Sequence, residues 1–510
     1  MKNIINLLRI ALFTNKVRLS QTENEKFLAQ QALARILADT KGLAMKIGQL
    51  YADTEGENAF NQLTKGVEPL PLRQMLPVLN EQLGFSSKKV FTKIDEAVAA
   101  ASLGQVHFAE LKTGEKVALK IRYPNITLAI ETELRLAGLL PEIGPAKQWG
   151  FDVKSYKINL RKNMLRELDY LSEANRQNEF AKRVQVDGLY TPVIHHDLCR
   201  EGVLVQSRAS GVMIDRIKGW PEPDKKIIGK ILLTTLFKSL FIAGEVHGDP
   251  HAGNVFYDYD QAGRPIVSLL DYGCTIPVAE YRRMALLKLI IACRLKLAIN
   301  PLDCFVALGF DADKLSHISG SLPLLCQSLF EPFLLDHPCN LANWELEKNI
   351  SHLLGEKRWW FRSAGPADLL LLMRAFQGLV QQLRFLQVSL NWWEVLQQAV
   401  GENNIKQAMI YEIPVVKVKT TELSTCFSEQ ATKLKVEVFE NGKKCVSVSL
   451  PAEAVLELEQ IMPNDVAELL RENDEIDLDT MVKNIKQFGL NPQTLFELSN
   501  NEKNYKVWLE

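Results

Sequence analysis

The stretch from His247 to Gly273 constrains this chain more than any other part of the sequence. Asp249 is followed five residues later by Asn254, and the apolar run 266–270 then leads to Asp271 in the sequence Asp-Tyr-Gly. In phosphoryl transfer, one carboxylate orients or deprotonates the attacking hydroxyl, while an Asn and a second Asp hold Mg²⁺ against the nucleotide phosphates. The order and spacing therefore predict Asp249 as the catalytic carboxylate, and Asn254 and Asp271 as the Mg²⁺ ligands.

A lysine upstream of this stretch supports the prediction. Strand-like runs at 106–111 and 116–123 are separated by a turn at Thr113-Gly114, and the second run carries Lys120. A cation at that place can reach the α and β phosphates of a nucleotide. Such a lysine needs a carboxylate to hold it, and the amphipathic segment that follows supplies Glu173.

That amphipathic segment, residues 159–184, is predicted to be helical. Glu167 and Asp169 are two residues apart and would lie on different faces of such a helix. Asp169 and Glu173 are four apart and would share one face. Taken alone, Glu167 and Asp169 are most simply interpreted as surface ion-pair residues.

The loop expected to cover the phosphates has an unusual composition. Protein kinases have glycines there, whereas this chain has Ala99, Ala100, Ala101 and Ser102 ahead of Leu103-Gly104-Gln105. Alanine is bulkier and less free in its backbone than glycine. We therefore expect the nucleotide to be held differently.

The bulk composition limits the partners and the cellular location. The 510 residues are 47% hydrophobic and 24% charged, and 60 basic against 61 acidic side chains give a net charge of −1. This balance gives no electrostatic case for nucleic acid. The eight cysteines are scattered without a CxxC pair, which favours reduced thiols and a cytoplasmic location. No apolar run reaches eighteen residues, so no membrane-spanning helix is expected.

Six motifs occur in a fixed order along the chain: KIGQ (46–49), AAASLGQVH (99–107), VALK (117–120), ELDYLSEA (167–174), HGDPHAGN (247–254) and LLDYG (269–273). Together they resemble the ABC1/UbiB/AarF family of atypical kinase-like proteins over roughly residues 30–400. The resemblance implies a protein-kinase-like fold that binds ATP and Mg²⁺, with N-terminal helices packed over the cleft. Family members are associated with ubiquinone biosynthesis and isoprenoid-lipid homeostasis, and show ATPase activity more readily than protein phosphorylation.

The resemblance also assigns residues by position. Lys46 and Gln49 correspond to the KxGQ motif, and Glu167 with Asp169 to the ExD motif. Lys120 and Glu173 correspond to the family's ion pair. The chain departs from the family pattern at Ala252, where many members have a second proline in the catalytic loop. It also departs after KIGQ, where an expected Ser and Arg are missing.

The fold class that follows is α+β, a protein-kinase-like two-lobe fold with added segments. We expect an N-terminal helical extension over 1–90, a small lobe with a helical insertion over 91–212, and a helical large lobe over 213–405. A hairpin around Asn441-Gly442, two short helices and a terminal strand at 505–509 would form an accessory module over 406–510. Many family members end instead in two membrane-spanning helices.

The leading functional prediction is an atypical kinase-like ATPase that uses ATP and Mg²⁺ and acts in quinone or isoprenoid-lipid metabolism. A small-molecule kinase of the aminoglycoside or choline phosphotransferase type is one alternative, because those enzymes share HGDxxxxN. A non-catalytic ATP-sensing scaffold is the other. The partners expected are a lipid or quinone-intermediate ligand, a peripheral contact with the inner face of the membrane, and a protein bound through the C-terminal module.

Overall fold

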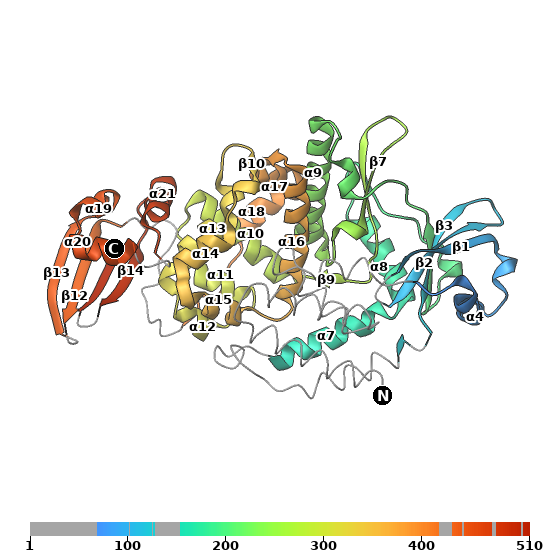
Figure 1. Ribbon diagram of the computed structural model, residues 1–510, viewed down its shortest axis with the longest axis horizontal. Coiled ribbons are helices and arrows are strands. Elements are labelled where there is room, and N and C mark those ends of the chain that lie inside the picture. The colour runs from blue at the N-terminus through green and yellow to red at the C-terminus, as the bar shows by residue number, and fades with distance from the viewer. Residues whose placement is uncertain are drawn as a thin grey trace.

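The computed structural model describes residues 69–100, 103–124, 126–127, 153–417, 431–440, 443–471, 476–500 and 503–510. In chain order they form a small lobe built on strands, a large helical lobe and a C-terminal module of strands and helices (Figure 1). This arrangement confirms the predicted two-lobed α+β class. Lys46 and Gln49 of the N-terminal extension, and Ala101 and Ser102 of the phosphate loop, lie outside the described residues.

The small lobe contains a four-stranded antiparallel sheet in the order β1-β2-β3-β5. Its strands are β1 (Phe91–Ala100), β2 (Gly104–Leu111), β3 (Lys116–Arg122) and β5 (Val203–Ser207). The hairpin predicted from the sequence is therefore confirmed, and Gly114 in its turn has a φ of 84°.

One face of this sheet is covered by helix α4 (Leu72–Leu83). The alternate β3 residues Val117, Leu119 and Ile121 are fully buried and share a hydrophobic core with Met75, Leu79 and Leu83 of the helix. Successive side chains of a strand point to opposite faces. Lys120, between Leu119 and Ile121, is therefore directed to the other face.

The helix predicted over 159–184 is interrupted in its middle. Helix α7 (Val153–Glu167) ends before Leu168, and α8 (Tyr170–Arg183) begins after Asp169. The Asp169 carboxylate accepts hydrogen bonds from the Ser172 backbone N–H at 3.0 Å and from its hydroxyl at 2.7 Å. The prediction that Asp169 and Glu173 share one helix face was therefore wrong, because Asp169 is the N-cap of the helix that carries Glu173.

The large lobe is a packed set of helices with short sheets (Figure 1). The helices are α9 (Glu222–Phe237), α10 (Glu280–Leu295), α11 (Pro301–Ala307), α12 (Ala312–Ser316), α13 (Leu322–Leu334), α14 (Leu346–Leu354), α15 (Arg358–Ala364), α16 (Leu369–Leu386), α17 (Trp392–Val400) and α18 (Glu402–Ile410). One short sheet has the order β4-β8-β7, from β4 (Leu189–Tyr190), β8 (Pro265–Leu269) and β7 (Val255–Tyr259). A second pairs β6 (Glu245–His247) with β9 (Thr275–Pro277). A third pairs β10 (Cys339–Asn340) with β11 (Ser389–Leu390). Trp392 is 1% exposed and packs edge-on against Phe237 and Phe333, so this tryptophan belongs to the helix core.

The C-terminal module has a separate hydrophobic core. Its four-stranded sheet has the order β13-β12-β15-β14, from β12 (Lys433–Glu440), β13 (Lys443–Pro451), β14 (Gln493–Asn500) and β15 (Lys503–Leu509). The helices α19 (Leu458–Ile461), α20 (Asn464–Arg471) and α21 (Leu478–Phe488) pack with it. The predicted hairpin strands and terminal strand are confirmed. Strand β14 was not predicted.

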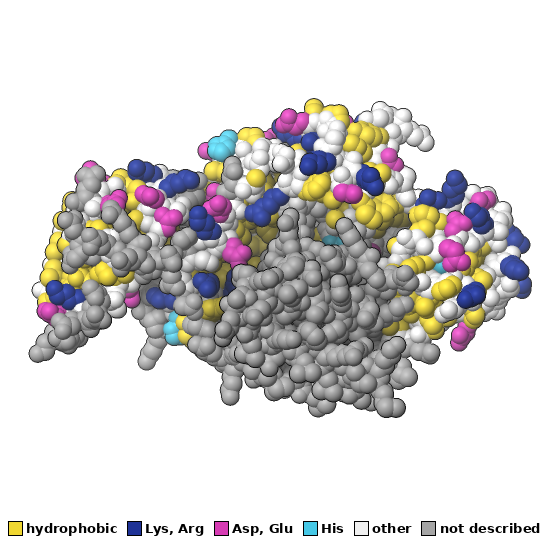
Figure 2. All heavy atoms as spheres, viewed as in Figure 1, with side chains coloured by type: hydrophobic (Ala, Val, Ile, Leu, Met, Phe, Trp, Pro, Cys, Tyr) yellow, Lys and Arg dark blue, Asp and Glu magenta, His cyan; other side chains and the backbone are white. Residues whose placement is uncertain are grey.

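The surface has a mixed charge distribution. On the face that Figure 2 shows, Lys and Arg side chains lie among Asp and Glu over both lobes. Within the described ranges, no helix is long and apolar enough to cross a membrane. The cysteines placed there, all but Cys426, are free thiols.

Candidate active site

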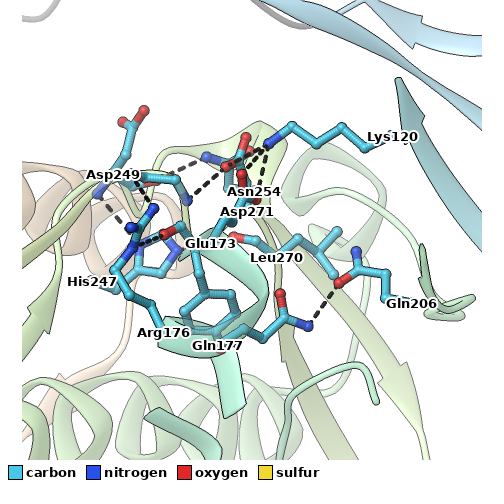
Figure 3. Close-up of polar contacts among 12 residues, drawn as sticks. Lys120, Glu173, Arg176, Gln177, Gln206, His247, Asp249, Asn254, Leu270 and Asp271 are labelled. Atoms are coloured by element: carbon cyan, nitrogen blue, oxygen red, sulfur yellow. Dashed lines mark hydrogen bonds and ion pairs between the residues drawn. The ribbon is translucent and has the colours of Figure 1, made fainter. Parts of the chain in front are cut away.

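Lys120 reaches from β3 toward two carboxylates that belong to distant parts of the chain (Figure 3). Its Nζ lies 2.9 Å from Oε1 and 3.0 Å from Oε2 of Glu173, and 3.1 Å from Oδ1 of Asp271. Burial alone would lower the pKa of Lys120, but the charges of Asp271 and Glu173 outweigh it and hold this pKa well above its ordinary value. The ammonium is therefore a fixed positive charge at the cleft.

Helix α8 holds the buried side of this ion pair. Glu173 lies in its first turn with a side chain only 2% exposed. Tyr170 begins the helix, and Lys120 Nζ lies 4.8 Å from the centre of its ring, within the range of a cation–π contact. The aromatic face and two carboxylates thus fix the position of the lysine head group.

Asp271 lies two residues after the end of strand β8 and has an unusual backbone. Its φ is 56°, in the left-handed region that only a small share of non-glycine residues adopt. Its Oδ1 also accepts a hydrogen bond from the Gly273 N–H at 3.1 Å. The Asp271 side chain contacts Lys120 and is still 37% exposed.

The predicted catalytic loop, residues 248–254, lies between β6 and β7. The side-chain N–H of Asn254 donates to the backbone carbonyl oxygen of Asp249 at 3.0 Å. The backbone carbonyl oxygen of Asn254 accepts from the Leu270 N–H at 2.8 Å. His247 donates from Nε2 to the Leu270 carbonyl at 3.0 Å and accepts at Nδ1 from the Asp249 N–H at 3.3 Å. These contacts join the loop to the end of the strand that leads into Asp271.

Arg374, on helix α16, is a member of the site that the sequence did not reveal. Its Nη2 lies 2.9 Å from Oδ1 of Asp249, and the two side chains are 11% and 12% exposed. Arg176 of α8 was also missed. It donates to the carbonyl oxygens of Tyr272 and Gly273, both at 3.2 Å. No local motif surrounds Arg374, whose partner is more than a hundred residues earlier in the chain.

A lysine clamped by two carboxylates, an adjacent Asp-Asn loop and an Asp-Tyr-Gly turn are the polar parts of a kinase-like cleft. Residues 62–297 match the family model of the ABC1 atypical kinase-like domain. This part of the chain is therefore similar to the ABC1 atypical kinase-like domain, in agreement with the resemblance carried by the six motifs.

Two relatives show the extent of the similarity. The chain is 28% identical over 254 residues to the atypical kinase COQ8B, mitochondrial, of Rattus norvegicus, with 48% of each protein aligned. It is 29% identical over 250 residues to the probable protein kinase UbiB of Azotobacter vinelandii, with 46% of this chain and 47% of that protein aligned. The chain thus spans about half the length of these relatives.

A solved structure shows the same fold. The Rv3197–erythromycin complex from Mycobacterium tuberculosis matches with a TM-score of 0.50 and 24% sequence identity, over 75% of this chain and 98% of that chain. At this level of identity the likeness concerns the fold alone. It supports the two-lobed architecture described above.

The ABC1 motifs can now be placed. Glu167, at the end of α7, lies near the Asp-Tyr-Gly turn, since a Cβ on Gly273 would be 3.7 Å from its Cγ. Asp169 caps α8. The two ExD acids are thus close in sequence, with Glu167 beside the turn and Asp169 at the helix start.

The predicted phosphate loop was expected to run from Ala99 to Gln105 between two strands, but the structure places both of its ends within the strands. Ala99 and Ala100 end β1, and Ala100 pairs with Gln105 at the start of β2. Gly104 lies against β3 and α8, because a Cβ there would be 2.4 Å from the Ile121 carbonyl oxygen and 2.5 Å from the Tyr170 hydroxyl. Glycine is therefore required at that position by packing.

The donor set at the cleft suits Mg²⁺. Because the Asn254 amide N–H₂ faces the Asp249 carbonyl, its side-chain oxygen is the atom left for a cation, and Asp271 supplies a carboxylate. Mg²⁺ usually binds one or two protein oxygens together with water and phosphate. Among the residues that the structure describes, no three His, Cys, Asp or Glu side chains gather as a metal site.

Proposed function

We propose that this protein binds Mg-ATP between its two lobes and acts as an atypical kinase-like ATPase. The observation that carries the proposal is the contact of Lys120 with both Glu173 and Asp271. One member of this triad lies on a small-lobe strand, one on α8 and one in the Asp-Tyr-Gly turn. A buried lysine held in this way places a positive charge where nucleotide phosphates bind in kinases.

Each polar residue then has a distinct role. Lys120 and Mg²⁺, held by Asn254 and Asp271, neutralise the triphosphate charge. Asp249 orients the nucleophile, which is water or the hydroxyl of a small substrate. The reduction of the barrier comes from positioning and charge stabilisation rather than from covalent chemistry by the protein.

The physiological setting that we propose is quinone or isoprenoid-lipid homeostasis. The resemblance to the UbiB branch of the family supports it. The protein would act in the cytoplasm or peripherally at the inner face of the membrane, with a lipid or quinone-intermediate ligand. The C-terminal module, with its separate core, would bind a protein partner.

The test is ADP release by the purified full chain with Mg-ATP, with and without quinone-like phenols and anionic lipid vesicles. The Asp271→Asn variant, which keeps the shape of the side chain, is the blank. Hydrolysis that rises with lipid or phenol and disappears in the variant would support the ATPase. ADP formed in proportion to an added metabolite would indicate a small-molecule kinase instead. Tight nucleotide binding without turnover under every condition would replace the proposal with an ATP-sensing scaffold.

A further inference from the structure

The side chain of Gln105 binds a backbone segment that comes before the small-lobe sheet. Its Oε1 accepts the Leu70 N–H at 2.8 Å, and its Nε2 donates to the Leu70 carbonyl oxygen at 2.7 Å. One amide thus pairs with both backbone groups of a single residue, as a neighbouring strand would do. Gln105 is completely buried.

A second side chain, His107, fixes the Gln105 amide. Its second N–H donates to Nε2 of His107 at 2.9 Å, and Nδ1 of His107 then donates to the Asp95 carbonyl oxygen on β1 at 2.9 Å. His107 is also completely buried. All four polar atoms of these two side chains are therefore paired, and such satisfied buried networks fix one geometry.

This network lies on the back of the phosphate hairpin, β1 and β2. Gln105 pairs with Ile121 across the sheet, whereas Lys120 pairs with Val106. Because neighbouring residues on a strand point to opposite faces, Gln105 points away from the face that carries Lys120. Gln105 therefore acts on a nucleotide only through the loop, to which it is joined by its pairing with Ala100.

A second contact fastens the same segment to β1. The Leu72 N–H, in the first turn of α4, donates to Oε2 of Glu96 at 2.9 Å. The N-cap residue of this helix, Pro71, makes no side-chain cap bond. Glu96 thus supplies the acceptor that the first turn of the helix requires.

We propose that Gln105 is a positioning residue that couples the junction, residues 69–72, to the phosphate loop. The junction connects the N-terminal part of the chain to the small lobe, so a displacement of the junction would shift the hairpin end at Ala100. This inference rests on the proposed function, because it treats the hairpin as the part that holds nucleotide. Glu96 assists Gln105 from the exposed side.

The test compares Gln105→Leu with Gln82→Leu. Leucine has a similar size but removes every amide hydrogen bond. Gln82 is a matched control, because it also bonds a backbone group in this lobe, the Gly202 N–H at 2.9 Å, but at the far end of α4. The measurements are the Mg-ATP dissociation constant, the split between KM and kcat, and hydrogen exchange of peptides covering 69–75 and 97–106. Glu96→Ala, a surface change, is the second variant.

We expect Gln105→Leu to weaken Mg-ATP binding about tenfold and to raise KM with little change in kcat. Exchange should rise in both peptides together. Glu96→Ala should shift the same quantities in the same direction by a smaller factor. If Gln105→Leu does not fold, the result for Glu96→Ala decides whether the junction is coupled to the phosphate loop. Gln82→Leu should lower the melting temperature without changing KM.

Two failures are distinguishable. Exchange that rises at 69–75 but stays unchanged at 97–106 would overturn the coupling, whether or not nucleotide is present. An unchanged Mg-ATP dissociation constant in both Gln105→Leu and Glu96→Ala would also overturn the coupling. Wild-type protein that binds no Mg-ATP would instead contradict the proposed function, while the exchange comparison would still test the coupling.

Discussion

The guanidinium of Arg374 on α16 lies 2.9 Å from the carboxylate of Asp249 in the catalytic loop, and both side chains are nearly buried. Hydrogen bonds to a charged partner are stronger than neutral ones, and an arginine holds a carboxylate in a defined orientation. A helix far along the chain thus fixes the group proposed to orient the nucleophile.

Replacement of Arg374 should therefore act on turnover. We expect Arg374→Gln to lower kcat for ATP hydrolysis about 100-fold, since small displacements of a catalytic group have effects of this order. KM for ATP should change little, because Arg374 holds Asp249, whereas the phosphates are expected to bind at Lys120 and Mg²⁺. Gln377→Ala, an exposed position on the same helix, is the control. A larger change in KM than in kcat would contradict this role.

Loss of the charges at the cleft should act on binding. Lys120→Ala and Asp271→Asn should each nearly abolish Mg-ATP binding and turnover, because the phosphates lose their fixed cation or their metal ligand. Lys116→Ala, at the exposed start of the same strand, should bind normally. Calorimetric titration checks the three variants. Wild-type affinity in both cleft variants would show that the site is elsewhere.

Ala100→Gly should strengthen nucleotide binding severalfold. Glycine restores backbone freedom at the end of β1, so backbone N–H groups of the loop can approach the phosphates more closely. Separate ATP and ADP dissociation constants are the measurement. Ala109→Gly, in the same hairpin but away from the loop, is the control. If Ala100→Gly has the same ATP dissociation constant and the same ADP dissociation constant as the wild type, the prediction is refuted.

Gly104→Ala should destabilise the small lobe. The new Cβ would lie 2.4 Å from the Ile121 carbonyl oxygen, a backbone atom that cannot turn aside. Overpacking of this kind costs about 1–3 kcal/mol of unfolding free energy. Gly219→Ala, where a Cβ meets no atom within 4 Å, should be close to neutral. Urea unfolding of both variants gives the comparison, and equal midpoints would disprove the close packing.

The buried ring of His247 should make a contribution to stability that is lost in mild acid. Burial lowers the pKa of His247 below its ordinary value of 6.5. Below pH 6.5 the unfolded chain binds a proton at this ring that the folded chain does not, so unfolding becomes easier as pH decreases. The slope from one such ring is at most about 1.4 kcal/mol per pH unit. Unfolding at pH 7.5, 6.5 and 5.5 should show a smaller slope in His247→Gln than in wild type. The exposed control His337→Gln should keep the wild-type slope.

The sequence predicted those parts of the site that lie within short motifs. Lys120, Asp249, Asn254 and Asp271 each follow from local spacing combined with phosphoryl-transfer chemistry, although their roles stay predictions. Arg374 had no such signal, because its position opposite Asp249 depends on how α16 packs in the large lobe. Helical periodicity likewise missed the break at Asp169, where a single side chain satisfies the free N–H groups of a helix start.

In the fold, the hairpins were the most predictable elements. Alternating apolar residues and turn glycines defined β2 with β3 and β12 with β13. Strand β14 was missed because its neighbour along the chain is helix α21, and its pairing with β15 is a tertiary contact. The boundaries at 90, 212 and 405 stay predictions.

Helix α8 contacts both the lysine of the small lobe and the Asp-Tyr-Gly turn. Its Glu173 binds Lys120, and its Arg176 binds the Tyr272 and Gly273 carbonyl oxygens. An outward swing of this helix would break the ion pair and release the turn after Asp271 in a single event. The helix and the turn therefore behave as one rigid part, and intermediate states with only one of them displaced are unfavourable. Opening of the cleft then requires motion elsewhere.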